Sequence, residues 1–299
     1  MESRIRRLIT REHLPEDYAS VVERYFSPIA VRTAAWRKTA GRCLTVGICG
    51  PQGSGKTTLC VFLEALLAGQ GIRAARVSLD DFYLTRAQRE DLARRVHPLF
   101  ATRGVPGTHD TALGISVLER LAAAAPGGKN APDDAQVRIP RFDKAVDDRK
   151  PELAWDTFAS PADVILFEGW CVGARPQAAE DLAAPVNALE RDLDPDGTWR
   201  RAVNDALAGP YQDLFSRMDR LILILPPDFA YVREWRALQE RKLRASTGRG
   251  MSDQEIARFV MYYERITRAV MAEMPPRADL VLEIGPDQRP TAARWKEDP

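Results

Sequence analysis

The sequence predicts an α/β protein with three layers, in which helices cover both faces of a mostly parallel sheet of five strands. Five short apolar runs, several of them uninterrupted as in buried parallel strands, alternate with longer segments of helical periodicity. A glycine-rich loop lies directly between the first run and a helix. The five expected strands span residues 44–48, 72–79, 164–167, 221–225 and 279–284, and a loose, polar tail is expected after the last of them.

The glycine-rich loop fits the phosphate-binding pattern G-x-x-x-x-G-K-[ST] from Gly50 to Thr57. Its glycines let the backbone wrap closely around a triphosphate, and the start of the next helix adds its positive end. Lys56 can reach the terminal phosphates, and the Thr57 hydroxyl can bind Mg²⁺. This motif predicts the P-loop NTPase fold. The expected ATP-binding residues are Gly50, Pro51, Gln52, Gly53, Ser54, Gly55, Lys56, Thr57 and Thr58.

The overall composition is that of an ordinary globular chain. The 299 residues carry a net charge of +1, which gives no reason to expect nucleic acid or an anionic membrane as a partner. No window approaches the roughly 18 apolar residues that a membrane-spanning helix needs, and no signal peptide is expected. The four cysteines form no CxxC pair, as expected of reduced thiols in a cytoplasmic protein. The oligomeric state stays open. We expect a helical N-terminal extension over residues 1–42 and a single domain over residues 43–299.

Carboxylates follow two of the apolar runs. Asp80 and Asp81 end the second run, and Glu168 ends the third. Because ligands of an open α/β sheet bind at the carboxyl ends of its strands, these side chains are expected close to the P-loop. Asp80 and Glu168, together with Thr57, form the expected Mg²⁺ site. The alternative interpretation of Asp80 and Asp81 is a solvated turn or a helix cap.

The strongly charged residues 84–96 are expected to form a helix with a solvated face. Two polar loops after them carry further candidates. Arg103 and His109 lie in a loop rich in glycine and proline, in which nothing obvious requires them for structure. Asp110 follows, and capping of the next helix explains it equally well. Residues 141–149 pack six charges into nine positions, which composition alone explains as a salt-bridged surface turn.

An arginine-rich helix is expected over residues 228–247. One interpretation is a solvated helix with ion pairs along its surface. The other is a lid over residues 233–250 that brings Arg241 and Arg244 onto a transferring phosphate. The arginines that share one side of the helix are Arg233, Arg236, Arg241 and Arg244.

A P-loop accompanied by these carboxylates favours phosphoryl transfer to a small acceptor. The chain lacks the [NT]-K-x-D motif that reads guanine, and a motor or remodelling ATPase is usually larger or assembled. Transfer to an alcohol needs a base near the hydroxyl, and Asp80 is the candidate. Lys56 and Glu168 complete the expected catalytic set. Arginines in the neighbouring loops indicate an anionic acceptor.

Longer strings carry a resemblance to known kinases. The Asp80-Asp-Phe-Tyr83 string resembles the D-S-F-[YH] of uridine kinases and phosphoribulokinases, in which the first Asp is the base. Six blocks in order resemble the D-glycerate 3-kinase family: GPQGSGKTTL, SLDDFYLT, RGVPGTHD, PRFDKAVDDR, FEGWCVGARP, and the WR..QE..L run ahead of GMSD. The resemblance covers residues 47–273 and implies transfer from ATP, with Mg²⁺, to D-glycerate to give 3-phosphoglycerate. The candidate acceptor residues are Asp81, Tyr83, Arg103, His109, Asp110, Asp143, Lys144 and Arg149.

One segment departs from the family pattern. Many members carry a longer D-K-S-x-x-x-G-x-G-D-R segment where this chain has the compact residues 143–149. The deletion leaves the acceptor open, so a kinase of the same fold for pantothenate, a nucleoside or a sugar phosphate is an alternative. A further alternative is an ATP-binding regulator without turnover, although such a protein has no need of a base.

Overall fold

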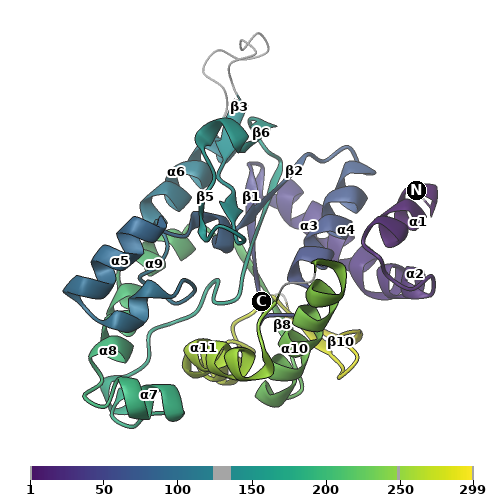
Figure 1. Cartoon of the computed structure of the whole chain (residues 1–299). Coiled ribbons are helices and arrows are strands. Elements are labelled where there is room, and N and C mark those ends of the chain that lie inside the picture. Colours follow the sequence, from purple (N-terminus) through teal and green to yellow (C-terminus); the bar gives the residue numbers. More distant parts are fainter. Residues whose placement is uncertain (1, 124–135, 248–249, 298–299) are drawn as a thin grey trace.

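The computed structural model describes residues 2–123, 136–247 and 250–297, and a six-stranded sheet forms its centre (Figure 1). The strand order is β10-β9-β8-β1-β7-β2, in which β10 is antiparallel to β9 and all other neighbours are parallel. The predicted α/β class and the five parallel strands are confirmed. The strands span Leu44–Cys49 (β1), Ala74–Ser78 (β2), Val164–Gly169 (β7), Arg220–Leu225 (β8), Leu280–Ile284 (β9) and Pro290–Trp295 (β10).

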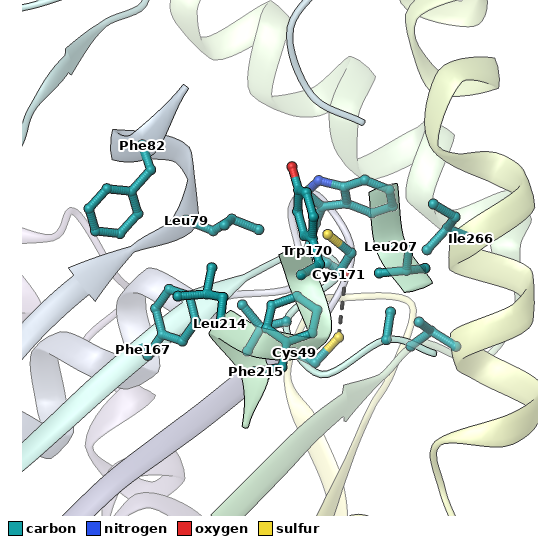
Figure 2. Close-up of a cluster of buried hydrophobic side chains, with 14 of the residues drawn as sticks. Cys49, Leu79, Phe82, Phe167, Trp170, Cys171, Leu207, Leu214, Phe215 and Ile266 are labelled. Carbon is teal, nitrogen blue, oxygen red and sulfur yellow. Dashed lines mark hydrogen bonds between the residues drawn. The ribbon is translucent and has the colours of Figure 1, made fainter. Parts of the chain in front are cut away.

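Helices cover both faces of this sheet because alternate strand side chains point to opposite sides. Val164 and Leu166 of β7 belong to one apolar cluster, whereas Ile165 and Phe167 belong to another (Figure 2). The first cluster includes side chains of α1 (Glu2–Arg11), α2 (Tyr18–Val21), α3 (Ser27–Ala40) and α4 (Lys56–Ala68). The second includes side chains of α6 (Thr111–Ala122), α7 (Ala188–Leu193), α8 (Thr198–Ala208), α9 (Pro210–Phe215) and α11 (Asp253–Glu273).

The sixth strand corrects an expectation, because residues after the fifth strand were expected to form a loose, polar tail. β10 instead pairs with β9 along the edge of the sheet, with a register shift near Pro290. Its side chains are mostly half-buried or exposed, so the segment shows no apolar run. Pairing with a neighbouring strand, rather than hydrophobicity, defines this edge strand.

The N-terminal helices pack directly on the helix that follows the P-loop. Phe26 and Ile29 are buried in the cluster that contains α4, and the rings of Phe26 and Phe62 are 5.8 Å apart. Tyr25 also donates a hydrogen bond of 2.8 Å to the carbonyl of Thr291 in β10. The N-terminal helices are thus in contact with both the core helix and the edge strand.

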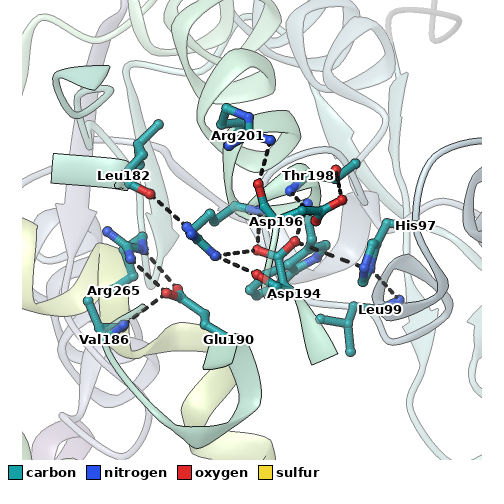
Figure 3. A network of polar contacts seen from close by, with 12 residues as sticks. His97, Leu99, Leu182, Val186, Glu190, Asp194, Asp196, Thr198, Arg201 and Arg265 are labelled. Carbon is teal, nitrogen blue, oxygen red and sulfur yellow. Dashed lines mark hydrogen bonds and ion pairs between the residues drawn. The ribbon is translucent and has the colours of Figure 1, made fainter. Parts of the chain in front are cut away.

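A small lobe built from α7 and α8 contains one buried ion pair and is held to α11 by a second (Figure 3). Asp194 is fully buried, pairs with Arg200 at 3.0 Å and accepts a hydrogen bond of 2.7 Å from the backbone N–H of Trp199. Glu190 pairs with Arg265 of α11 at 2.6 Å. These contacts fix α11, whose other side faces the P-loop region.

The remaining elements lie outside the central sheet. They are α5 (Arg86–Arg95), α10 (Phe229–Thr247), the paired strands β3 (Gln136–Ile139) and β6 (Asp156–Ala159), and the short hairpin of β4 (Phe142–Asp143) and β5 (Asp148–Arg149). None of the described helices is long and apolar enough to cross a membrane.

Candidate active site

The P-loop joins β1 to α4, which begins at Lys56. Gly53 and Gly55 have φ values of 78° and 88°, in the left-handed region that favours glycine. A Cβ atom at Gly53 would lie 2.8 Å from the Cβ atom of Trp235, so close packing also requires glycine there. The Lys56 ammonium donates a 3.0 Å hydrogen bond to the carbonyl of Pro51 and lies over the loop.

Glu168 lies at the carboxyl end of β7, beside the first turn of α4. The Thr57 hydroxyl donates a hydrogen bond of 3.1 Å to its carboxylate. Burial raises the pKa of Glu168, and the nearby Lys56 ammonium opposes this effect. The sequence prediction that a carboxylate would approach the P-loop threonine is matched by this contact.

Asp80 follows β2 and accepts two strong hydrogen bonds. Tyr83 donates its hydroxyl to one carboxylate oxygen at 2.8 Å, and Lys144 donates its ammonium to the other at 2.6 Å. Burial raises the pKa of Asp80, but Lys144, Tyr83 and Lys56 outweigh it and leave the pKa below its ordinary value. Asp80 is therefore ionised at neutral pH.

These side chains line one cavity of about 270 Å³. The P-loop forms one wall, and the ends of β2 and β7 form the floor. Two cationic side chains from loops, Arg103 and Lys144, also line the cavity. The described lining residues are Gln52, Gly53, Gly55, Lys56, Thr57, Thr58, Asp80, Tyr83, Arg103, Lys144, Glu168, Trp170, Arg236, Gln239, Phe259 and Tyr263.

Asp81 supports the site from behind instead of lining it. Its carboxylate accepts hydrogen bonds from the Arg141 guanidinium at 2.8 Å and from the backbone N–H of Phe142 at 3.0 Å. Asp143 accepts a bond of 2.9 Å from the backbone N–H of Ala145 within the same hairpin. The β4–β5 hairpin is thus fixed to the end of β2, which places Lys144 against Asp80.

Arg103 is oriented by a buried ionic cluster at Asp147. Asp147 pairs with Arg103 and with Arg89, whose guanidinium lies 2.9 Å away. Arg89 is 1% exposed and also donates to the carbonyl of Ala101 at 2.8 Å. The sequence prediction of a solvated helix over residues 84–96 is wrong at Arg89, because its neighbours in sequence do not reveal the distant Asp147.

His109, Asp110 and Arg149 lie behind the cavity. His109 is buried, stacks on the Tyr83 ring at 4.5 Å and shares a hydrogen bond with the Tyr211 hydroxyl. Asp110 caps α6 by accepting from the backbone N–H of Leu113 at 3.0 Å, as its alternative interpretation expected. Arg149 donates to Asp110 at 3.3 Å and to the carbonyl of Tyr83 at 3.0 Å. Among the described contacts, these three residues support Tyr83.

Arg236 faces the cavity from α10, whereas Arg241 and Arg244 were the arginines expected from the sequence to reach a transferring phosphate. Its guanidinium lies 5.1 Å from the centre of the Phe259 ring and pairs with the buried Glu240. Arg241 is exposed, and Arg244 donates to the carbonyl of Met251. Two positions of the expected lid, 248 and 249, lie outside the described residues.

Aromatic side chains close the side of the cavity opposite the P-loop, and the sequence analysis did not assign them to the site. Trp170 and Tyr263 meet edge to face at 4.9 Å, and Phe259 packs on Tyr263 at 4.9 Å. The Trp170 indole donates to the carbonyl of Gly104 at 2.9 Å. In the sequence, Phe259 and Tyr263 match the buried face of α11, so their position at the site has no separate signal.

The oxygen atoms in the cavity suit a hard divalent cation. No group of three or more His, Cys, Asp or Glu side chains in the described residues could hold a metal ion without further ligands. Thr57, Asp80 and Glu168 nevertheless line the same space. Mg²⁺ typically combines one or two carboxylates with phosphate oxygens and water, so these residues fit an ion that binds together with a nucleotide.

Comparison with known proteins agrees with this site, although no family model matches the chain. The chain is 35% identical over 235 residues to a Schizosaccharomyces pombe protein described as an uncharacterized kinase. This match covers 76% of this chain and 80% of that relative. It is 32% identical over 265 residues to chloroplastic D-glycerate 3-kinase of Arabidopsis thaliana, over 84% of this chain and 54% of the relative. The structure of a D-glycerate 3-kinase from Cryptococcus neoformans superposes with a TM-score of 0.74 at 25% identity, over 93% of this chain and 99% of that one.

The parallel sheet, the P-loop and the carboxylates at its edge are those of a P-loop kinase. Relatives named as kinases match 76% and 84% of this chain. The chain belongs to the P-loop kinase family that includes the D-glycerate 3-kinases, and it is an ATP-dependent phosphotransferase that acts on an alcohol.

Proposed function

We propose that this kinase transfers the γ-phosphoryl group of ATP to D-glycerate and releases 3-phosphoglycerate and ADP. The observation that carries the proposal is the pairing of Asp80 with Lys144 at 2.6 Å inside a P-loop cavity. A carboxylate base and a cation for an anionic acceptor then lie side by side. The relatives named D-glycerate 3-kinase support the choice of this acceptor and of its 3-hydroxyl group.

Nucleotide phosphates are held by the backbone N–H groups of residues 50–58 and by Lys56. Thr57 and Glu168 are the proposed Mg²⁺ ligands, with Asp80 within the same space. When bound, Mg²⁺ supplies positive charge to the phosphate oxygens. Lys56 leaves the carbonyl of Pro51 to contact the transferring phosphate and stabilises the charge that develops there.

Asp80 is the proposed base. Its low pKa makes it a weak base, which suits a loose transition state in which the alcohol proton leaves late. Tyr83 holds one of its oxygens and leaves the other to Lys144. Entry of the acceptor exchanges this Lys144 contact for a contact with the acceptor carboxylate, which frees that oxygen for the hydroxyl.

The acceptor carboxylate is bound by Lys144 and Arg103 in this proposal. Arg103 is already oriented by Asp147 and by the face of Phe142, 5.6 Å from its guanidinium. The cavity of about 270 Å³ must also admit the terminal phosphates, and aromatic rings close its far side.

A coupled assay of ADP release with Mg-ATP tests the proposal directly. The acceptors are D-glycerate, L-glycerate, pantothenate, uridine and ribulose 5-phosphate, and the product is identified by its chromatographic retention. Strong turnover with D-glycerate alone and formation of 3-phosphoglycerate support the proposal. Faster turnover with another acceptor would reject D-glycerate as the substrate, and formation of 2-phosphoglycerate would reject the 3-hydroxyl.

A further inference from the structure

The turn between β9 and β10 reaches the tip of the P-loop. The Gln288 side-chain amide donates a hydrogen bond of 2.6 Å to the backbone carbonyl of Gly53. Gln288 has a φ of 64°, which is uncommon for a residue other than glycine. A left-handed conformation of this kind persists only where the surrounding structure holds it.

Two groups of contacts hold this turn. Within it, the backbone N–H of Gly285 donates to the carbonyl of Arg289 at 2.8 Å, and that of Gln288 donates to the carbonyl of Gly285 at 3.0 Å. Outside it, the Arg289 guanidinium pairs with both carboxylate oxygens of Asp17 at 2.7 and 2.9 Å. The backbone at Gln288 is therefore held both by hydrogen bonds within the turn and by the ion pair of Arg289 with Asp17.

Trp235 holds the loop tip from the other side. Its indole N–H donates to the carbonyl of Pro286 at 2.9 Å, so the turn and the tryptophan support each other. Trp235 is buried, and its Cβ atom leaves no room for a side chain at Gly53. The peptide group that follows Gly53 thus lies between the β9–β10 turn and α10.

We propose that Gln288 is a positioning residue for nucleotide binding, which fixes the Gly53 carbonyl outside the phosphate cradle before any ligand arrives. A carbonyl oxygen that turned toward a phosphate would repel it, and ordering a free loop on binding would weaken affinity. Gln288 affects phosphate binding through the loop and makes no contact with the adenine base of the nucleotide. The inference rests on the proposed use of the P-loop for ATP but is independent of the acceptor.

The test replaces Gln288 by Met, which keeps the side-chain length and adds no charge. Calorimetric titration with Mg-ADP and with magnesium tripolyphosphate gives two dissociation constants. We expect both to rise about three- to tenfold, as loss of one hydrogen bond would cause. The KM for ATP rises in parallel, whereas kcat and the KM for the acceptor change less than twofold.

Arg294→Met is the matched control, because it removes an ion pair with Glu283 between β10 and β9 without altering the turn or touching the P-loop. It is expected to bind both ligands within twofold of the unsubstituted protein. Trp235→Phe removes the indole N–H that supports the turn, and we expect a smaller loss in the same direction. The thermal unfolding temperature identifies any variant that has lost its fold.

Unchanged affinity of Gln288→Met for both ligands would overturn the inference. A loss of affinity for Mg-ADP alone would also overturn the inference, because Gln288 would then contact the adenine base or the ribose. An unsubstituted protein that binds Mg-ADP but leaves D-glycerate unphosphorylated would reject the proposed acceptor, while these affinities would still decide the role of Gln288.

Discussion

Single residues set the chemistry of the cavity through contacts that are distant in sequence. Lys144 lies on a hairpin 64 positions after Asp80, yet its ammonium is 2.6 Å from the Asp80 carboxylate. Tyr83, three positions after Asp80, completes the pair of donors. The state of the proposed base therefore depends on one local and one long-range contact.

Asp80→Asn is expected to lower kcat about 10²- to 10⁴-fold, because an amide cannot accept the proton of the acceptor hydroxyl. Mg-ADP affinity should stay within about threefold of the unsubstituted value, since the P-loop is untouched. Steady-state kinetics and calorimetric titration measure the two quantities. Unchanged turnover would remove Asp80 as the base.

His109 predicts a dependence of stability on pH. Burial lowers the pKa of His109 from 6.5 to about 3, so the folded protein keeps this ring neutral. Because the unfolded chain binds a proton below pH 6.5 and the folded chain does not, His109 makes stability fall as pH decreases from 6.5 toward 3. The expected slope is about 1.4 kcal/mol per pH unit.

Urea unfolding of the His109→Phe variant and of the unsubstituted protein, between pH 7 and pH 4.5, tests this effect. The variant keeps a ring to stack on Tyr83 but cannot titrate. Its unfolding free energy should fall less steeply with decreasing pH. Parallel curves for the two proteins would show that His109 does not govern the slope.

Sequence reasoning at the residue scale worked best where a motif requires a local geometry. It predicted Lys56, Thr57, Asp80 and Glu168, which line one cavity. It could not separate residues that contact the cavity from residues that support them, because Arg103 and His109 come from the same loop, yet Arg103 lines the cavity and His109 stacks on Tyr83 without lining it. That distinction depends on packing between elements.

Among the elements, α10 illustrates the same limit. The first part of this helix belongs to the core, since Val232 and Trp235 are buried. Arg241, further along the helix, is exposed. The arginine stripe was predicted from helical spacing, but the spacing does not say which end of the stripe meets the P-loop. The packing of Trp235 on Gly53 places Arg236 at the cavity.

Arg236→Met is expected to lower kcat and kcat/KM together, by about tenfold or more, because the guanidinium would contact phosphate most strongly in the transition state. Arg241→Met is the matched control on the same helix and should change neither value more than twofold. Initial rates at saturating and limiting ATP provide both constants. A larger loss of kcat for Arg241→Met than for Arg236→Met would support the lid expected from the sequence, in which Arg241 reaches the transferring phosphate.

At the scale of the whole molecule, the N-terminal segment packs against the C-terminal edge of the sheet. Trp36 of α3 and Trp295 of β10 lie 5.9 Å apart, edge to face. Asp17 and Arg289 form a bidentate ion pair. The N-terminal helices therefore contribute to the same body as the P-loop helix.

Ile29→Ala tests whether this contribution is structural. Ile29 is fully buried against the core, so its truncation should lower the free energy of unfolding by about 2–5 kcal/mol. Val31→Ala, at a position that is 61% exposed, is the control and should change it by less than about 0.5 kcal/mol. Urea denaturation gives both values, and equal small losses would mean that these helices fold separately.

The sequence by itself determined the class of fold, the P-loop and the carboxylates at the edge of the sheet. These features depend on local patterns, namely apolar runs of strand length, helical spacing, and glycines at fixed positions. Only the tertiary structure decided that β10 pairs as a sixth strand, that aromatic rings and Arg236 line the cavity, and that Gln288 contacts Gly53. Each of these depends on which distant segments pack together, and hydrophobic periodicity does not encode that pairing.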